Sequence, residues 1–268
     1  MTADGPGPTG VAAFFDLEGT ILARSSGRAL SRASSRAGAV NQRAALKSGY
    51  AQLVASLSSA DDEQVDRLRD RLTALCAGWD VAQVTAVVEE TLHDVVDPLV
   101  YAEASARLAE HRERGEDVVV VSASGTEVVQ AVGRMLGATH CLGSRMVTVG
   151  GRYTGEVEFT CVGAAKAVAV RELAERQGYD LARCSAYGDS IGDLPLLEAV
   201  GHPTAVNPDR KLRREAAQRD WPVVAFEAPV SLRRLSGPRG GQVAAAAVGI
   251  GAVAAGAAWY GLRRRRHE

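Results

Sequence analysis

The chain has 268 residues, of which 46% are hydrophobic, and its formal net charge is -1. This hydrophobic content excludes a wholly disordered chain, and the length suits one domain with an insertion or two small domains. The near-neutral charge gives no support for a nucleic-acid partner, and no basic-aromatic groove pattern is present.

The cysteines are spread along the chain, at Cys76, Cys141, Cys161 and Cys184. None belongs to a C-x-x-C pair, and disulfide frameworks are typical of shorter secreted chains. We therefore expect reduced, mostly buried thiols. Residues 1–10 lack the basic start and apolar run of a secretory signal. We interpret them as a flexible arm and expect the catalytic part in the cytoplasm.

Apolar runs with the character of buried parallel strands occur at residues 11–15, 118–121, 184–187 and 202–206. The first three end at Asp16, at Ser122 and at Gly188-Asp189. Helical patterns are seen at residues 98–114, 125–136, 164–177 and 193–199. This alternation predicts an α/β fold, a doubly wound parallel sheet with ligands beyond the carboxyl ends of the strands.

Residues 11–23 and 98–230 are expected to form this core domain. Residues 24–97 break the alternation because they contain helical patterns only, for example at 61–75. An all-helical insertion directly after the first strand predicts a cap over the crevice. Residues 146–160, with two glycines between β-rich runs, predict a hairpin.

The end of the chain changes in composition. Residues 231–241 have the composition of a linker, and residues 242–262 carry no charge over a length that can cross a bilayer core. Trp259 and Tyr260 lie where an interfacial belt would be. We interpret the run as a transmembrane helix that anchors the protein, followed by a basic tail at 263–268. The alternative is an Ala-rich helix packed on the domain, and flanking arginines on both sides leave the orientation open.

Residues 14–20 read FFDLEGT and carry the first chemical signal. A carboxylate at the end of a buried strand, here Asp16, can attack phosphorus while backbone amides of the following Gly19-Thr20 turn hold phosphoryl oxygens. Taken alone, this string is also compatible with an exposed turn.

Further polar residues follow in order at predicted strand and helix ends. The hydroxyl of Ser122 can donate to a phosphoryl oxygen, and Lys166 near the start of a helix can neutralise a phosphate. Asp189 and Asp193 in the string GDSIGD supply the hard oxygens that Mg²⁺ prefers. Each has a plainer interpretation as a helix cap or a solvated lysine, but together they predict one site.

These motifs resemble those of the haloacid-dehalogenase superfamily, specifically its phosphoserine-phosphatase-like branch with a helical cap. The resemblance covers residues 11–228 and includes the segments VVVVSASGTEVVQAVGRMLGA, GRYTGEV and YGDSIGDLPLLEAVGHPTAVNPDRKLRREAAQRDWPV. It implies a Mg²⁺-dependent phosphatase that hydrolyses a small phosphomonoester through an aspartyl-phosphate.

The resemblance also implies roles for individual residues. Asp16 would be the nucleophile, Glu18 the general acid and base, and Asp193 a support for a metal-bound water and for Lys166. The backbone carbonyl of Glu18 would be a metal ligand. The implied phosphate-binding residues are Gly19, Thr20, Ser122 and Lys166, and the implied metal-site residues are Asp16, Glu18, Asp189 and Asp193.

Glu18 departs from the usual family motif, which has Asp two residues after the nucleophile. Its extra methylene displaces the carboxyl, and errors of about one ångström can cost about a hundredfold in rate. Enolase-phosphatases in the same superfamily look similar here, with D-x-E-G-T. The alternatives to an active phosphatase are a catalytically impaired, membrane-tethered binding protein and a phosphotransferase.

The substrate is least legible because it should be chosen by the cap. Residues 23–26 lack the Glu that phosphoserine phosphatases place after the first motif, so phosphoserine is one candidate among small phosphorylated metabolites. A membrane anchor would favour a lipid precursor. Basic residues that could meet an anionic substrate, or simply form a solvated face, are Arg24, Arg28, Arg32, Arg36 and Arg43.

Overall fold

The computed structural model describes residues 10–23, 70–71, 73–96 and 99–227. The described strands form one sheet in the order β4-β3-β2-β1-β5-β6-β7. They are β1 (Ala12–Asp16), β2 (Asp117–Gly125), β3 (His140–Val149), β4 (Arg152–Phe159), β5 (Ser185–Gly188), β6 (His202–Val206) and β7 (Val223–Val224). Only β3 and β4 pair in an antiparallel manner, and the other neighbours are parallel. The predicted α/β fold with a mainly parallel sheet is confirmed.

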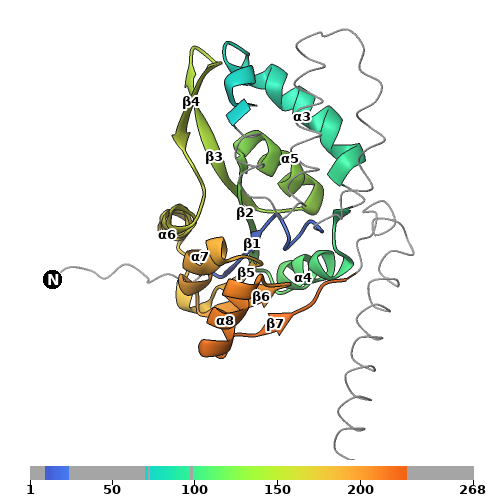
Figure 1. Cartoon of the computed structure of the whole chain (residues 1–268), viewed down its shortest axis with the longest axis vertical. Coiled ribbons are helices and arrows are strands. Elements are labelled where there is room, and N and C mark those ends of the chain that lie inside the picture. The colour runs from blue at the N-terminus through green and yellow to red at the C-terminus, as the bar shows by residue number, and fades with distance from the viewer. Residues whose placement is uncertain (1–9, 24–69, 72, 97–98, 228–268) are drawn as a thin grey trace, which may run out of the picture.

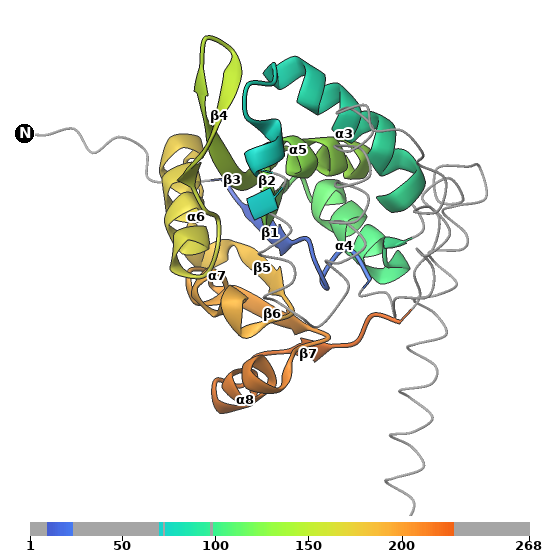
Figure 2. The same cartoon turned by 45° about the horizontal axis from the view of Figure 1, so that its top comes forward.

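Helices cover both faces of the sheet (Figure 1). They are α3 (Val81–Val96), α4 (Ala102–Glu113), α5 (Thr126–Leu136), α6 (Ala164–Gln177), α7 (Leu194–Glu198) and α8 (Arg210–Gln218), with 3₁₀ turns η3 (Leu181–Arg183) and η4 (Ile191–Asp193). Both views show α6, α7 and α8 on one side of the strands and α3, α4 and α5 on the other (Figure 2). The helix expected from Pro98 begins only at Ala102. Val100 bridges Leu22 and the Tyr101 N–H donates to the Ile21 carbonyl, so these two residues are extended chain rather than α-helix.

Strand alternation produces the two cores. Successive side chains of a strand point to opposite faces, so Phe15 packs with α3, α4 and α5 while Phe14 packs with α6, α7 and α8. Both phenylalanines are fully buried. Each full burial of this kind stabilises the fold by about 1.5–3 kcal/mol. The short β1 is therefore held from both sides, and the residue that ends it cannot shift easily.

The register places the end of β1 between two neighbours. Asp16 pairs with Val121 of β2, and Phe15 pairs with Tyr187 of β5. β1 ends at Asp16 and β5 ends at Gly188, one residue after Tyr187, whereas β2 continues past Val121 to Gly125. The residues that follow Val121 and Tyr187 are therefore brought beside Asp16, as the carboxyl ends of parallel strands require.

The predicted hairpin is present but begins earlier than expected, because β3 starts at His140. The first half of β3 pairs in parallel with β2, and its second half pairs in antiparallel fashion with β4. Its sequence pattern marked only the second half. Helix α8 and the short β7 were not predicted. All four cysteines are free and three of them are buried, as expected.

Part of the predicted cap and the whole C-terminal region lie outside the described residues. Within the interval 24–97, the structure describes helical residues 70–71 and 73–76 and the helix α3, which contacts α5. The arm at 1–9, the linker at 231–241, the membrane helix at 242–262 and the basic tail are not described. No helix in the part of the chain that is described combines the length and the apolar character needed to span a bilayer.

Candidate active site

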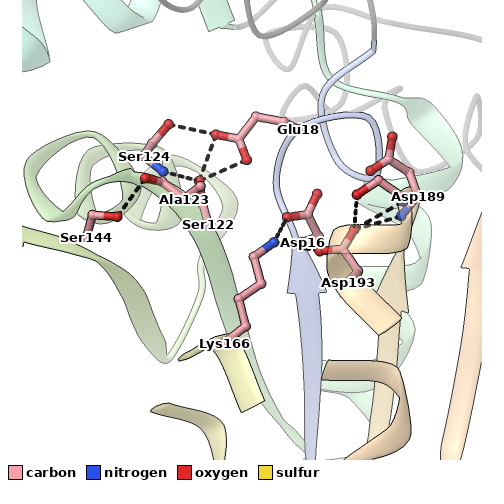
Figure 3. A network of polar contacts seen from close by, with 10 residues as sticks. Asp16, Glu18, Ser122, Ala123, Ser124, Ser144, Lys166, Asp189 and Asp193 are labelled. Atoms are coloured by element: carbon pink, nitrogen blue, oxygen red, sulfur yellow. Dashed lines mark hydrogen bonds and ion pairs between the residues drawn. The ribbon is translucent and has the colours of Figure 1, made fainter. Parts of the chain in front are cut away.

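Polar side chains from three strands and one helix meet at the carboxyl edge of the sheet (Figure 3). Asp16 is the last residue of β1, Ser122 lies in β2 directly after Val121, and Asp189 follows β5. Lys166 lies in the first turn of α6. The parallel register explains why the strand residues meet, and the packing of α6 on the Phe14 face brings the lysine to them.

Lys166 bridges two carboxylates in the interior. Its Nζ lies 2.5 Å from Oδ1 of Asp16 and 2.6 Å from Oδ1 of Asp193, and no more than 5% of any of these residues is exposed. Burial alone would lower the pKa of Lys166, but the two carboxylates outweigh it and raise the pKa well above its usual range. The lysine therefore stays charged and can bind an anion.

Three buried carboxylates face this single ammonium group. Oxygens of Asp16, Asp189 and Asp193 lie within 4.8 Å of one another. Burial raises the pKa of Asp16 well above its usual range, and the charge of Asp193 raises it further, while Lys166 opposes both. Ionising all three carboxyl groups beside one ammonium group in a desolvated place is therefore unfavourable without a further cation. A small divalent cation held by oxygen ligands fits such a donor set.

Asp193 also organises the loop that carries Asp189. Its Oδ2 accepts hydrogen bonds from the backbone N–H groups of Asp189 and Ser190, both at 3.2 Å, and from the Ser190 hydroxyl at 3.1 Å. Its other oxygen accepts from Lys166. Both oxygens are therefore engaged with protein groups, which favours a supporting role over direct metal ligation for this residue.

Glu18 turns toward β2 and away from the carboxylate cluster (Figure 3). Its Oε1 accepts hydrogen bonds from the hydroxyls of Ser122 and Ser124, both at 2.7 Å. Its Oε2 lies 2.9 Å from the Ser122 hydroxyl. Both serines are fully buried, while Glu18 is half-buried. The carboxylate is thus fixed beside the serine that was predicted to bind phosphate.

The turn after Asp16 is tight. The Leu17 carbonyl accepts from the N–H groups of Ile21 at 3.1 Å and Leu22 at 2.8 Å, and the Gly19 N–H donates to the Leu22 carbonyl at 2.8 Å. Gly19 has a φ of 88°, which glycine adopts without strain. The Gly19 amide is used inside the turn, whereas the buried Thr20 hydroxyl has no partner among the described residues.

The structure therefore brings Asp16, Lys166, Asp189 and Asp193 into one cluster and places Glu18 on Ser122. Sequence reasoning missed the polar contacts of Ser124 and Ser190. The spacing S-x-S in a strand, which places both side chains on one face, was the available signal for Ser124. For Ser190 the signal was the capping-box pattern S-x-x-D.

Comparisons with known proteins agree with this arrangement. The family model of haloacid dehalogenase-like hydrolases matches residues 13–198. A Mycobacterium tuberculosis protein named as a probable phosphatase is 57% identical over 256 residues, 95% of this chain and 89% of that protein. A phosphoserine phosphatase of the same organism is 31% identical over 245 residues, 91% of this chain and 80% of the other. A solved phosphoserine phosphatase, in its phospho-aspartyl intermediate analogue form, has the same fold, with a TM-score of 0.52, 17% identity, and coverage of 85% and 97%.

Proposed function

The chain belongs to the haloacid dehalogenase-like hydrolases and is a phosphatase, and we propose that it hydrolyses a small phosphomonoester through a Mg²⁺-dependent, two-step mechanism with Asp16 as nucleophile. The observation that carries this proposal is the buried contact of Lys166 with Asp16 and Asp193. A lysine held against a carboxylate at a strand end provides an anion site beside a nucleophile.

In the first step, an oxygen of Asp16 attacks phosphorus in line with the leaving group. An Asp16 O–P bond forms and the bond from phosphorus to the substrate oxygen breaks. Glu18 donates a proton to that departing oxygen, which leaves as an alcohol. In the second step Glu18 takes a proton from water, the water oxygen attacks phosphorus, and the carboxylate of Asp16 is released with inorganic phosphate.

The phosphoryl group is held by the residues around Asp16. The charged Lys166 offsets its negative charge, and the hydroxyl of Ser122 donates to one of its oxygens. The buried and unpaired hydroxyl of Thr20 supports a similar role for that residue. Gly19 gives the turn its left-handed conformation, since its own N–H is already donated to Leu22.

The carboxylates fit a Mg²⁺ ion. Asp16 and Asp189 would hold it directly, with the backbone carbonyl of Glu18, and Asp193 would support it while anchoring Lys166. Bound Mg²⁺ would supply charge neutralisation for the phosphate and for the transition state. Burial raises the pKa of Asp16 in the absence of an ion, and a bound cation would favour the ionised carboxylate that the attack requires.

The substrate class is a small phosphorylated metabolite or a lipid precursor. The likeness to a phosphoserine phosphatase makes phosphoserine one candidate. However, Ala23 and the residues after it lack the Glu that such enzymes place after the first motif. The predicted cap would choose among these substrates, and most of it lies outside the described residues.

A panel of phosphomonoesters, lipid precursors included, tests the proposal with Mg²⁺ present. We expect phosphate release from at least one substrate by the wild type and a loss of more than about a thousandfold in Asp16→Asn, since the amide cannot act as the nucleophile. Equal release by the two proteins would show that Asp16 is not the nucleophile. Release of the substrate alcohol without inorganic phosphate, seen only when an acceptor alcohol is present, would indicate a phosphotransferase, because the acceptor then carries the phosphoryl group away.

A further inference from the structure

The carboxylate of Glu18 is bound by two serine hydroxyls of the same strand. Ser122 and Ser124 are two residues apart in β2, so their side chains lie on the same face. Each hydroxyl reaches Oε1 of Glu18 at 2.7 Å. Hydrogen bonds to an ionised acceptor are about twice as strong as neutral ones, and both donors are fully buried. The position of this carboxylate is therefore determined by β2.

The two hydroxyls have different demands on them. A serine hydroxyl has one proton to donate, and the proposed mechanism assigns the Ser122 proton to a phosphoryl oxygen. When Ser122 turns its proton to the substrate, it can no longer hold Glu18. Ser124 then remains the donor to the carboxylate. Its backbone N–H also donates to the Ser122 hydroxyl at 2.9 Å, which orients that oxygen independently of the Ser124 side chain.

We propose that Ser124 is a positioning residue that holds the Glu18 carboxylate at the leaving-group oxygen while Ser122 binds the phosphoryl group. This inference rests on the proposed function. The longer side chain of Glu18 and the hydroxyl of Ser124 act as a matched pair: Glu reaches over the end of β2, and Ser124 removes the freedom that the extra methylene introduces. Misplacement of about one ångström would otherwise lower the rate about a hundredfold.

The dependence of rate on the leaving group separates this role from a structural one. Phenyl phosphate and p-nitrophenyl phosphate are similar in size, but p-nitrophenolate leaves without a proton, whereas phenolate is the stronger base and needs one. We expect Ser124→Ala to lower kcat/KM about tenfold for phenyl phosphate and less than about twofold for p-nitrophenyl phosphate. kcat/KM is the right measure because it reports the first chemical step, in which the leaving group departs.

Ser144→Ala is the matched control. The Ser144 hydroxyl donates to the Ala123 carbonyl at 2.7 Å and so supports the same end of β2 without touching Glu18. Any loss in this variant should be equal for the two substrates. Equal losses for both substrates in Ser124→Ala would overturn the proposal and indicate that Ser124 only supports the end of β2. Full activity on both substrates would also overturn the proposal. Thermal unfolding of each variant confirms that the comparison is made between folded proteins.

A double-mutant cycle with Glu18→Asp provides the second measurement. The shorter Asp cannot keep the same contact with Ser124, so removing the hydroxyl in that background should change kcat/KM for phenyl phosphate less than twofold. A tenfold loss in both backgrounds would mean that Ser124 acts independently of Glu18. Asp16→Asn is assayed in parallel, and activity in that variant would refute the proposed function itself. If Asp16→Asn is inactive but the effects of Ser124→Ala and Glu18→Asp are additive, only the positioning role of Ser124 is refuted.

Discussion

Two buried polar clusters lie on the same strands and differ in character. The active-site cluster lies at the carboxyl edge of the sheet, and the other lies around His111 in the interior beneath it. In the active-site cluster, Lys166 bridges Asp16 and Asp193, and Asp189 lies close to these two carboxylates. On the α4 side, His111 is 1% exposed and its ring nitrogens contact Glu116 at 2.5 Å and the Tyr187 hydroxyl at 2.8 Å. Phe15 stacks on Tyr187, with ring centroids 4.3 Å apart, and meets His111 edge-on.

The two clusters differ in how well their charges are satisfied. Both ring nitrogens of His111 have partners: Nε2 lies beside the Tyr187 hydroxyl, and Nδ1 lies beside Glu116 and, at 2.6 Å, the guanidinium of Arg114. Arg114 in turn pairs with Glu116 at 2.7 Å. Burial lowers the pKa of His111 and raises that of Tyr187, which keeps both neutral. The active-site cluster instead gathers three buried carboxyl groups near the single ammonium group of Lys166. The comparison teaches that the fold crowds carboxyl groups where chemistry is proposed and keeps groups with matched partners directly behind them.

Removing the ammonium should have the largest effect on stability. Lys166→Met in metal-free protein leaves Asp16 and Asp193 buried without their cation, and we expect the free energy of unfolding to fall by about 3–5 kcal/mol. Urea unfolding monitored by circular dichroism measures this. Lys211→Met, on the exposed face of α8, is the control and should change little. An unchanged stability in Lys166→Met would mean that water reaches the carboxylates and the crevice is not desolvated.

Disrupting the cluster around His111 should lower the free energy of unfolding somewhat less than the loss of Lys166. His111→Ala opens a cavity and leaves the buried Tyr187 hydroxyl without its His111 partner, so we expect a loss of about 2–4 kcal/mol. The proposed catalytic groups are untouched, and kcat/KM of the remaining folded enzyme should stay within a few-fold of the wild type. The exposed His202→Ala is the control. A large kcat/KM loss without loss of stability would show that the cluster takes part in catalysis instead.

Mg²⁺ should stabilise the protein through the carboxylates of the active-site cluster and not through the cluster around His111. A ligand that binds the native state stabilises it by about 2.7 kcal/mol at about a hundred times its Kd. We therefore expect Tm to rise when Mg²⁺ is added, by the amount that such a stabilisation produces. Asp189→Asn should abolish most of the gain, whereas His111→Ala should keep it. Equal gains in wild type and Asp189→Asn would place the ion elsewhere.

Mild acid should destabilise the protein through His111, and this is the smallest effect that we expect. The pKa of His111 lies below its ordinary value of 6.5 because burial disfavours the imidazolium, although Glu116 opposes this. As the pH falls below 6.5, the unfolded chain binds the proton first, so stability that is fully present above this pH is lost on acidification. Tm measured between pH 7 and pH 5 with saturating Mg²⁺ should fall more for the wild type than for His111→Gln. Parallel curves would exclude His111 as the source.

Much of the fold could be predicted because it depends on local pattern. The apolar runs before Asp16 and Ser122 are bounded by polar residues; β1 begins at Ala12, one residue after the start of the first run, and β2 contains the whole of the second. The strand at His202–Val206 was predicted with the observed bounds. The start of α4 was not, because residues 99–101 pair with the segment after Asp16, a contact between distant parts of the chain that no local pattern reports.

The candidate site divides in the same way. Carboxylates, a lysine and a serine that end predicted strands or begin a helix could be identified one by one, since their residue types carry the chemistry. The direction of the Glu18 side chain could not, because it is decided by hydroxyls more than a hundred residues away. The contact of His111 with Tyr187 is equally invisible, as it joins a helix to a strand across the sheet.

The amino-acid order alone determined most of the strands and helices and the identity of the reactive groups, because hydrophobic periodicity and residue chemistry are properties of short segments. Only the tertiary structure decided which groups share a proton or a charge: Lys166 between Asp16 and Asp193, and Glu18 on Ser122 and Ser124. The physical reason is that hydrogen bonds and buried ion pairs act over about 3 Å, and distances on that scale between remote residues are set by packing around β1.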